Sequence, residues 1–179
     1  MARSWRRRNA SRSSPASRST GAKCADDSGL CVDVIGGAPG VASAHFAPIE
    51  REAGEERETF RRRQDLANNR RLLELLRGER RRDAHFVATL VAVRRADDPE
   101  PVVAIGRWVG ELLEAPRGTG GFGYDPLLYL PSFDRTVAEL DPGTKNRLSH
   151  RAQAADRMLS LLRHSWGLRA LDEASASGR

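Results

Sequence analysis

Two mostly apolar stretches near the middle of the chain have the pattern of neighbouring strands. Residues 85–95 (HFVATLVAVRR) and 102–113 (VVAIGRWVGELL) are rich in β-branched and apolar residues, which favour strands. The short ADDPEP turn between them predicts an antiparallel pair. Shorter extended segments, bounded in part by Gly and Pro, are predicted within 30–40 (LCVDVIGGAPG), 127–131 (LLYLP) and 135–140 (RTVAEL).

A helix is predicted over residues 64–78 (QDLANNRRLLELLRG), after a charged stretch at 47–63 that we expect to be a loop leading into it. Gly78 is a stop signal for this helix. Its expected apolar face consists of leucines at positions i, i+7 and i+10 and one flanking leucine: Leu66, Leu73, Leu76 and Leu72.

A second helix is predicted to begin at Asp141, because an aspartate N-cap followed by proline is a common helix start. Gly167 marks its expected end. The residues expected to face the core are Ala155, Met158, Leu159 and Leu162. These patterns together predict an α/β fold with a mixed central sheet flanked by helices.

The positive charge of the chain is concentrated at its N-terminus. The formal net charge is +6, but residues 1–23 hold six arginines, one lysine and no acid, so the remaining residues sum to −1. We therefore expect the 24–168 domain to have no general affinity for polyanions. No apolar run approaches the roughly 20 residues of a membrane-spanning helix. The two cysteines, Cys24 and Cys31, fit a reducing compartment better than a disulfide framework.

The segment 1–23 (MARSWRRRNASRSSPASRSTGAK) is rich in Arg and Ser and nearly free of apolar residues, a composition typical of disorder. Three interpretations stay open: a segment similar to a mitochondrial transit peptide, an arm that binds nucleic acid, or non-native sequence from a wrong start or a frameshift. Residues 169–179 are expected to fray.

Two adjacent carboxylates, Asp26 and Asp27, stand before the first predicted strand and are followed by Ser28. A simple turn would use the same residue types. The functional interpretation is a magnesium site, because Mg²⁺ takes carboxylate oxygens and often uses only one or two of them together with phosphate and water. Adjacent side chains of an extended chain point in opposite directions, so only one of the two carboxylates is expected to face the site.

Residues 118–126 (GTGGFGYDP) combine four glycines with a tyrosine and an aspartate. A loose loop between strands is the ordinary interpretation. Alternatively, the glycines let a ligand approach the backbone, whose N–H groups can hold an anion. An aromatic residue beside them can stack on a base, and the acid can bond to the edge of that base. The stretch is not a Walker A loop, because no Gly-Lys-Ser/Thr follows.

Cations gather in TKNRLSHR, residues 144–151. A solvated helix face would account for them. However, only Lys23 and Lys145 are lysines among the 30 basic residues, so a lysine at this position indicates a need for a compact ammonium, for example opposite a phosphate. Acids for a metal, glycines for close approach, an aromatic ring and cations together describe a nucleoside triphosphate site.

The stretches ADDSGLCVDVIGGAPGV, PRGTGGFGYDP and KNRLSHR, in this order, resemble the signatures of the inosine triphosphate pyrophosphatase family, which includes the bacterial dITP/XTP pyrophosphatases. The resemblance runs from about Ala25 to Gly167, and ANNRRLLELL is similar to the family's middle helix. It implies Mg²⁺-dependent hydrolysis of nonstandard purine nucleoside triphosphates (ITP, dITP, XTP) to the monophosphate and pyrophosphate, which cleanses the nucleotide pool. It also implies a cytoplasmic homodimer that binds neither membranes nor nucleic acid.

The resemblance assigns roles by position. Asp27 resembles the general base and metal-site acid, with Asp26 as a second candidate ligand, and Ser28 resembles a substrate contact. The base-recognition loop corresponds to Phe122, Gly123, Tyr124 and Asp125. The residues that hold the 6-oxo edge of the purine and the nucleotide correspond to Lys145, His150 and Arg151. A lysine or arginine donates to O6 but cannot accept from the amino group of adenine, and each buried polar group left unpaired costs about 1–3 kcal/mol.

The sequence departs from the family pattern in two places. Family members begin with a strand, a Ser/Thr-x-Asn-x-x-Lys phosphate loop and a helix with a metal-binding Glu, and residues 1–23 contain neither the loop nor the acid. Ala42 and His45 stand where the family more often has an aromatic residue and an arginine. Two alternatives therefore stay open: a catalytically impaired remnant that binds purine nucleotides, and a nucleic-acid-binding protein acting through its Arg-rich segment.

Overall fold

A five-stranded antiparallel sheet organises the part of the chain that this computed structural model describes, residues 21–167. The strands follow one another in space as they do in sequence. They are β1 (Lys23–Val32), β2 (Asp83–Val93), β3 (Val102–Leu112), β4 (Leu128–Leu130) and β5 (Arg135–Thr136). The predicted α/β class is confirmed, although every pair of neighbouring strands in the described residues is antiparallel rather than mixed.

Residues 1–20 and 168–179 lie outside the described part of the chain. The interpretations of the segment 1–23, the limits of the 24–168 domain and the expected fraying of 169–179 therefore stay predictions. Within the described residues, no helix is long and apolar enough to cross a membrane.

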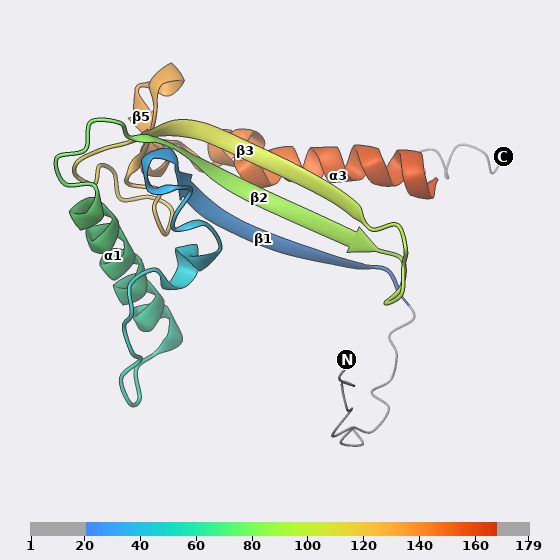
Figure 1. The fold of residues 1–179 in the computed structure, drawn as a ribbon, viewed down its shortest axis with the longest axis horizontal. Helices are drawn as coiled ribbons and strands as arrows, with labels where there is room; N and C mark the ends of the chain where they lie inside the picture. The colour runs from blue at the N-terminus through green and yellow to red at the C-terminus, as the bar shows by residue number, and fades with distance from the viewer. Residues whose placement is uncertain (1–20, 168–179) are drawn as a thin grey trace, which may run out of the picture.

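The strand pair predicted at 85–95 and 102–113 is confirmed. β2 and β3 pair from Asp83 opposite Glu111 to Ala92 opposite Val102, and together with β1 they form the long twisted ribbon of Figure 1. Buried and more exposed side chains alternate along β3. One face of this hairpin therefore packs against the protein, while the other is more open to solvent.

The first strand is longer than predicted. β1 already includes Asp26 and Asp27, which lie opposite Leu90 and Thr89 of β2 rather than in a turn before the strand. Ten consecutive residues of β1 pair with β2, and this pairing outweighs the turn preference of the Asp-Asp-Ser-Gly sequence. Within the predicted 30–40 segment the strand ends at Val32, a 3₁₀ turn follows at Asp33–Ile35, and a second begins at Gly40.

One further segment is corrected in part. The extended piece predicted at 135–140 is a strand only over β5, and a 3₁₀ turn follows at Val137–Glu139. The side chains of Thr136 and Glu139 form a capping box there, which satisfies the free N–H groups at the start of the turn.

α1 (Arg57–Leu75) begins seven residues before its predicted start and buries a different face. Leu72 and Leu76 are buried as predicted, but Leu66 is 68% exposed. The buried stripe also contains amide side chains: Gln64, Asn68 and Asn69. They face inward because this side of α1 packs against loop backbone, whose N–H and C=O groups need partners.

The single helix predicted after Asp141 consists of two helices, α2 (Pro142–Leu148) and α3 (His150–Trp166). The Asp141 N-cap is confirmed, since its side chain accepts from the N–H of Thr144 at 2.9 Å. Ser149 interrupts the helix in an extended conformation and caps α3 in the same way. Gly167 ends α3 as predicted, with a φ of +64°.

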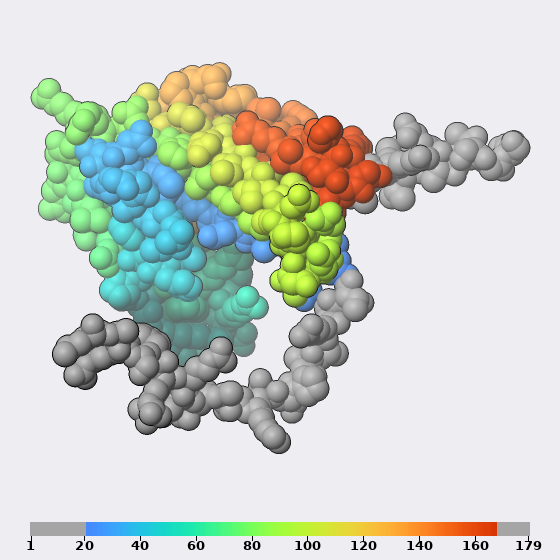
Figure 2. Space-filling model, turned by 45° about the vertical axis from the view of Figure 1, so that its right-hand side comes forward, coloured from blue at the N-terminus to red at the C-terminus, as the bar shows by residue number. Residues whose placement is uncertain are grey.

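The core-facing side of α3 is confirmed at Met158 and Leu162 and corrected at Ala155 and Leu159. Ala154 and Met158 are buried, whereas Ala155 is exposed and Leu159 is 46% exposed. α3 lies along the β2–β3 hairpin, as Figures 1 and 2 show.

Small residues let α3 approach the sheet closely. A side chain on Gly106 of β3 would collide with the carbonyl oxygen of His150 and the backbone N of Ala154. The absence of a side chain at Gly106 thus lets the first turn of α3 lie directly against the sheet.

A separate, larger core lies between the sheet, α1 and the loops, and includes Leu30, Leu72, Phe86, Trp108 and Tyr124.

Candidate active site

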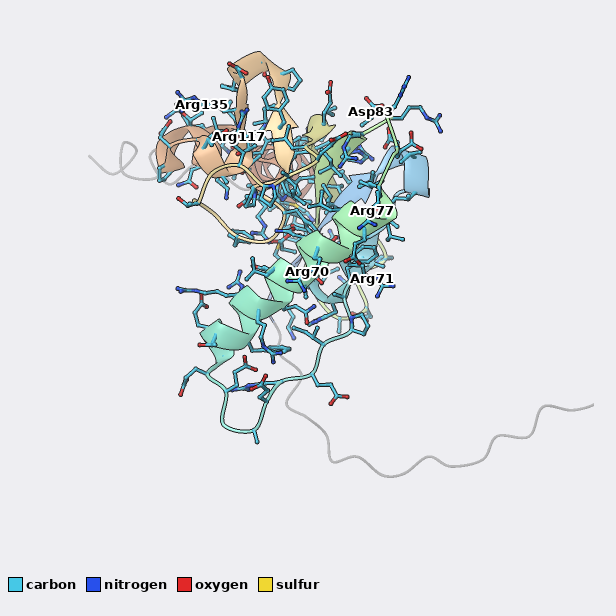
Figure 3. The ribbon with its side chains drawn as sticks, turned by 90° about the vertical axis from the view of Figure 1, so that its left-hand side faces the viewer. Arg70, Arg71, Arg77, Asp83, Arg117 and Arg135 are labelled. Carbon is cyan, nitrogen blue, oxygen red and sulfur yellow. The ribbon has the colours of Figure 1, made fainter. Side chains whose placement is uncertain are left out.

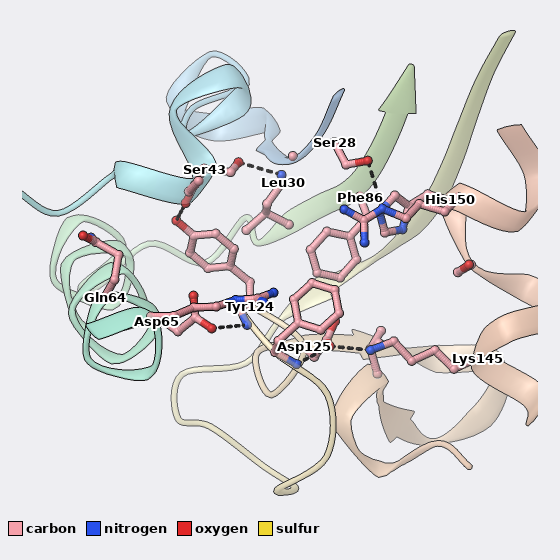
Figure 4. Close-up of a pocket in the computed structure, with 18 of the residues that line it drawn as sticks. Ser28, Leu30, Ser43, Gln64, Asp65, Phe86, Tyr124, Asp125, Lys145 and His150 are labelled. Carbon is pink, nitrogen blue, oxygen red and sulfur yellow. Dashed lines mark hydrogen bonds and ion pairs between the residues drawn. The ribbon is translucent and has the colours of Figure 1, made fainter. Parts of the chain in front are cut away.

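A cavity of about 1090 Å³ opens where β1, α1, the 118–126 loop and the start of α3 meet, as Figure 4 shows. Its volume suits a nucleotide-sized ligand. The eight substrate contacts implied by the resemblance all line this cavity: Ser28, Phe122, Gly123, Tyr124, Asp125, Lys145, His150 and Arg151. The fold thus gathers three sequence motifs that are far apart along the chain.

The glycines of the 118–126 loop pack mainly against the protein itself. A Cβ on Gly121 would collide with the carboxylate of Asp125, and one on Gly120 would lie 2.7 Å from the carbonyl oxygen of Ala138. Gly123 differs, because a Cβ there would meet open space and its φ of +61° is what requires glycine. Close approach of a ligand, the predicted reason for these glycines, therefore does not account for Gly120 and Gly121.

Asp125 joins this loop to α2. Its side chain is almost fully buried, and Oδ2 accepts from the N–H of Phe122 at 2.8 Å and from Nζ of Lys145 at 2.5 Å. Because an ammonium has three donors, the bond to Asp125 leaves Lys145 able to donate to a ligand in the cavity.

The ring of Phe122 is 48% exposed and is surrounded by cations. The Lys145 ammonium lies 4.9 Å from its centroid, and the guanidinium groups of Arg61 and Arg151 lie at 5.3 and 5.7 Å. An exposed aromatic face can stack on a planar base, while the cations attract both the ring and an anionic ligand.

Tyr124 serves mainly as an anchor. Only 4% of it is exposed, and its hydroxyl donates to the carbonyl oxygen of Ser43 at 3.0 Å. Burial raises the pKa of this phenol above its usual range. The ring therefore lines the cavity while its polar end is already used within the protein.

His150 lies at the first position of α3, with its ring stacked on Phe86 at a centroid distance of 5.0 Å. Burial, and then the neighbouring charge of Arg151, lowers the pKa of His150 to about 4. The imidazole is therefore neutral at pH 7. Its Nδ1 is buried without a hydrogen-bond partner among the described residues, so it remains available to a polar group of a ligand.

Asp26 and Asp27 point to opposite faces of β1, as predicted from their adjacency. Asp26 accepts from the Ser28 hydroxyl at 2.9 Å and lies 3.4 Å from Nε of Arg151. Asp27 belongs to the other face, and neither carboxylate lines the cavity. Asp27 makes no ion pair within residues 21–167.

The described residues do not form a preformed metal cage. Nowhere in residues 21–167 do three or more His, Cys, Asp or Glu side chains converge as they would around a metal ion. Among the described residues Asp27 has no ion-pair partner, whereas Asp26 lies 3.4 Å from Nε of Arg151. This donor set fits a magnesium ion only where phosphate and water supply most of its ligands.

α1 contributes six cavity residues that the motifs did not indicate: Arg57, Glu58, Phe60, Arg61, Gln64 and Asp65. The sequence feature that could have indicated them is the recurrence of polar residues, and not only leucines, at helical spacing in this segment. Their neighbour Asn68 holds the loop before the helix, since its Oδ1 accepts from Ala47 N–H and its Nδ2 donates to the Ser43 carbonyl. Ser43 in turn accepts from the N–H of Leu30 at 2.9 Å.

An antiparallel sheet whose end opens into a nucleotide-sized cavity, lined by an aromatic ring, the Asp125–Lys145 ion pair and further cations, is typical of an α/β protein of the nucleotide-binding kind. The sequence profile of the Ham1 family matches residues 7–161, and this chain belongs to the Ham1 family. The resemblance seen in the three motifs is thereby confirmed.

Named relatives and solved structures agree with this assignment. The chain is 62% identical over 146 residues to a dITP/XTP pyrophosphatase of Leptothrix cholodnii, covering 80% of this chain and 69% of the relative. It is 57% identical over 145 residues to one of Methylibium petroleiphilum, covering 81% and 69%. Among solved structures, a HAM1 protein from Coxiella burnetii has a TM-score of 0.71 at 36% identity, covering 82% of this chain and 70% of the other.

Proposed function

We propose that this chain hydrolyses nonstandard purine nucleoside triphosphates such as dITP, ITP and XTP to the monophosphate and pyrophosphate. The observation that carries the proposal is the convergence of all eight implied substrate contacts on one cavity. It is supported by 62% identity to a dITP/XTP pyrophosphatase.

The base would stack on the exposed ring of Phe122. Lys145, Arg151 and the neutral imidazole of His150 lie around the same cavity and offer donors to a 6-oxo group. Adenine presents an amino group at that position, which cannot accept a hydrogen bond from Lys145 or Arg151. Such a mismatch discriminates strongly, because it leaves buried polar groups unpaired.

In the reaction, the oxygen of water attacks the α-phosphorus, the bond to the α–β bridging oxygen breaks, and pyrophosphate leaves. We assign Asp27 as the general base that takes the proton from water. This assignment rests on the resemblance. Asp27 adjoins Ser28 at the cavity but faces the other side of β1.

Magnesium is the metal that we propose, with Asp27 as its protein ligand and Asp26 as the second candidate. When bound, a divalent cation neutralises phosphate charge and polarises the phosphoryl group. We also propose a homodimer in the cytoplasm that binds no nucleic acid, on the basis of the resemblance alone.

The test is pyrophosphate release by the purified full chain with dITP or XTP and Mg²⁺, with dATP as the discrimination control. We expect turnover of dITP, and we expect Asp27→Asn to lower kcat by at least about 100-fold because the general base is lost. Asp97→Asn, an exposed acid outside the cavity, should leave turnover unchanged. Thermal stabilisation by dITP without pyrophosphate release would instead identify a nucleotide-binding remnant.

A further inference from the structure

α1 holds the main chain of Gly123 at both of its polar groups. Oδ2 of Asp65 accepts from the Gly123 N–H at 2.9 Å, and Nδ2 of Asn69 donates to the Gly123 carbonyl oxygen at 3.0 Å. Asp65 and Asn69 are four residues apart, so they lie on the same side of the helix. Figure 4 shows Asp65 of α1 pointing toward the loop that carries Tyr124 and Asp125.

Gly123 is the point at which the loop changes direction. Its φ is +61°, and it separates the half-exposed ring of Phe122 from the buried ring of Tyr124. The residue before it, Phe122, is held by a second contact, because the Asp125 carboxylate accepts a hydrogen bond from the Phe122 N–H. The contacts from α1 fix the following residue, so the position of the Phe122 ring in the cavity depends on both.

Asn69 is placed for hydrogen bonding rather than for packing. It is only 7% exposed, yet its Oδ1 has no partner among the described residues. A buried unpaired acceptor costs free energy that an apolar side chain of the same size would avoid. The presence of an amide at this buried position is therefore explained by the hydrogen bond that it donates to the Gly123 carbonyl oxygen.

We propose that Asp65 and Asn69 are positioning residues that set the substrate selectivity of the cavity by fixing Gly123 and, through it, the Phe122 ring. This inference rests on the proposed function, because the ring is taken to stack on the purine. The motifs assign no role to either residue. They would act on the affinity for the base and not on the attack at phosphorus, so their effect belongs in KM and in the preference for dITP over dATP.

The chemistry of the two bonds allows a test with isosteric variants. Asp65→Asn keeps an oxygen that can accept from Gly123, so kcat/KM for dITP should stay within about threefold of the unmodified chain. Asp65→Leu removes the acceptor, and Asn69→Asp replaces the donor with a carboxylate that faces a carbonyl oxygen. Both should lower kcat/KM about 5- to 100-fold, mainly through KM, and reduce the dITP/dATP ratio.

Leu66→Ala is the matched control, because Leu66 adjoins Asp65 on α1 but is 68% exposed and does not line the cavity. Thermal unfolding of each variant shows whether it folds. If Asn69→Asp does not fold, Asn69→Leu replaces it, because leucine has the same branched shape and no charge. Folded Asp65→Leu and Asn69→Leu proteins with unchanged KM and unchanged dITP/dATP ratio would overturn the inference. So would an Asp65→Asn protein as impaired as Asp65→Leu.

The dissociation constant of dITP, measured by calorimetry on the same variants, separates this inference from the proposed function. If the unmodified chain binds dITP without releasing pyrophosphate, the hydrolytic function fails, and the same ranking of variants is then expected in Kd. If the unmodified chain neither binds nor hydrolyses dITP, both proposals are overturned.

Discussion

Asp125 shows how much of the cavity wall depends on single contacts. Its buried carboxylate binds both a backbone N–H of its own loop and the ammonium of Lys145. Gly121 leaves the space for that carboxylate, since any side chain there would collide with it. The motif indicated these residues, but it did not indicate that Asp125 and Gly121 depend on one another, because that depends on where the Asp125 side chain points in the folded loop.

The implied substrate contacts and the two acids take different places in the structure. All eight implied contacts line one cavity, whereas Asp26 and Asp27 do not. The sequence could predict that adjacent carboxylates diverge. It could not predict that Asp26 pairs with Arg151, a residue 125 positions away in the chain.

His150 should make the folded state sensitive to acid. Its pKa of about 4 in the folded chain lies below the ordinary value of about 6.5 expected after unfolding. Above pH 6.5 both states are neutral at this residue, so it contributes no pH dependence. As the pH falls from about 6.5 to about 4, only the unfolded state takes up the proton, and stability decreases.

We therefore expect Tm to fall between pH 7 and pH 5, and to fall less in a His150→Gln variant, as followed by circular dichroism. His164→Gln is the control, because His164 is exposed near the end of α3. An acid sensitivity that is equal in the His150→Gln variant and the unmodified chain would show that this histidine is not the cause.

At the level of elements, predictions succeeded where local chemistry decides and failed where tertiary contacts do. The hairpin of β2 and β3, the Asp141 cap and the Gly167 stop were all readable from the sequence. The length of β1 was not, because a turn-forming sequence is held in a strand by its neighbour. The buried face of α1 was predicted only at its leucines, since its amide side chains pair with loop backbone that has no sequence signature.

The docking of α3 on the sheet gives a prediction at this scale. Gly106→Ala would place a methyl group against the His150 carbonyl oxygen and the Ala154 nitrogen. Overpacking of this kind typically costs about 1–3 kcal/mol, and the helix start would move together with His150. We expect a lower denaturation midpoint in urea and a higher KM for dITP.

Val103→Ala provides the comparison for this variant. Val103 lies on the same strand but is 48% exposed on the outer face, so its truncation should change the midpoint little. A Gly106→Ala protein with the midpoint and KM of the unmodified chain would show that α3 can shift without affecting the site.

For the whole molecule, the net charge conceals a strong separation of charge. Outside residues 1–23 the chain sums to −1, yet residues 57–82 contain ten arginines and four acids, a net +6 that equals the charge of the entire chain. Arg70, Arg71 and Arg77 lie along α1 and just beyond its end in Figure 3. The expectation that the domain lacks affinity for polyanions rested on its net charge of −1. That net charge does not reveal the cluster of positive charge on and after α1.

Two arginines of α1, Arg57 and Arg61, line the cavity and should draw in the anionic substrate. Because salt shortens the range of such attraction from about 10 Å at 0.1 M to about 3 Å at 1 M, we expect KM for dITP to rise about 3- to 10-fold between 0.05 and 0.5 M NaCl, with little change in kcat. Arg57→Gln combined with Arg61→Gln should raise KM at low salt and flatten this dependence. Arg77→Gln, beyond the end of the helix and outside the cavity lining, should do neither. A double variant with an unchanged slope would place the attraction elsewhere, leaving Lys145 and Arg151 as the cations that the substrate meets first.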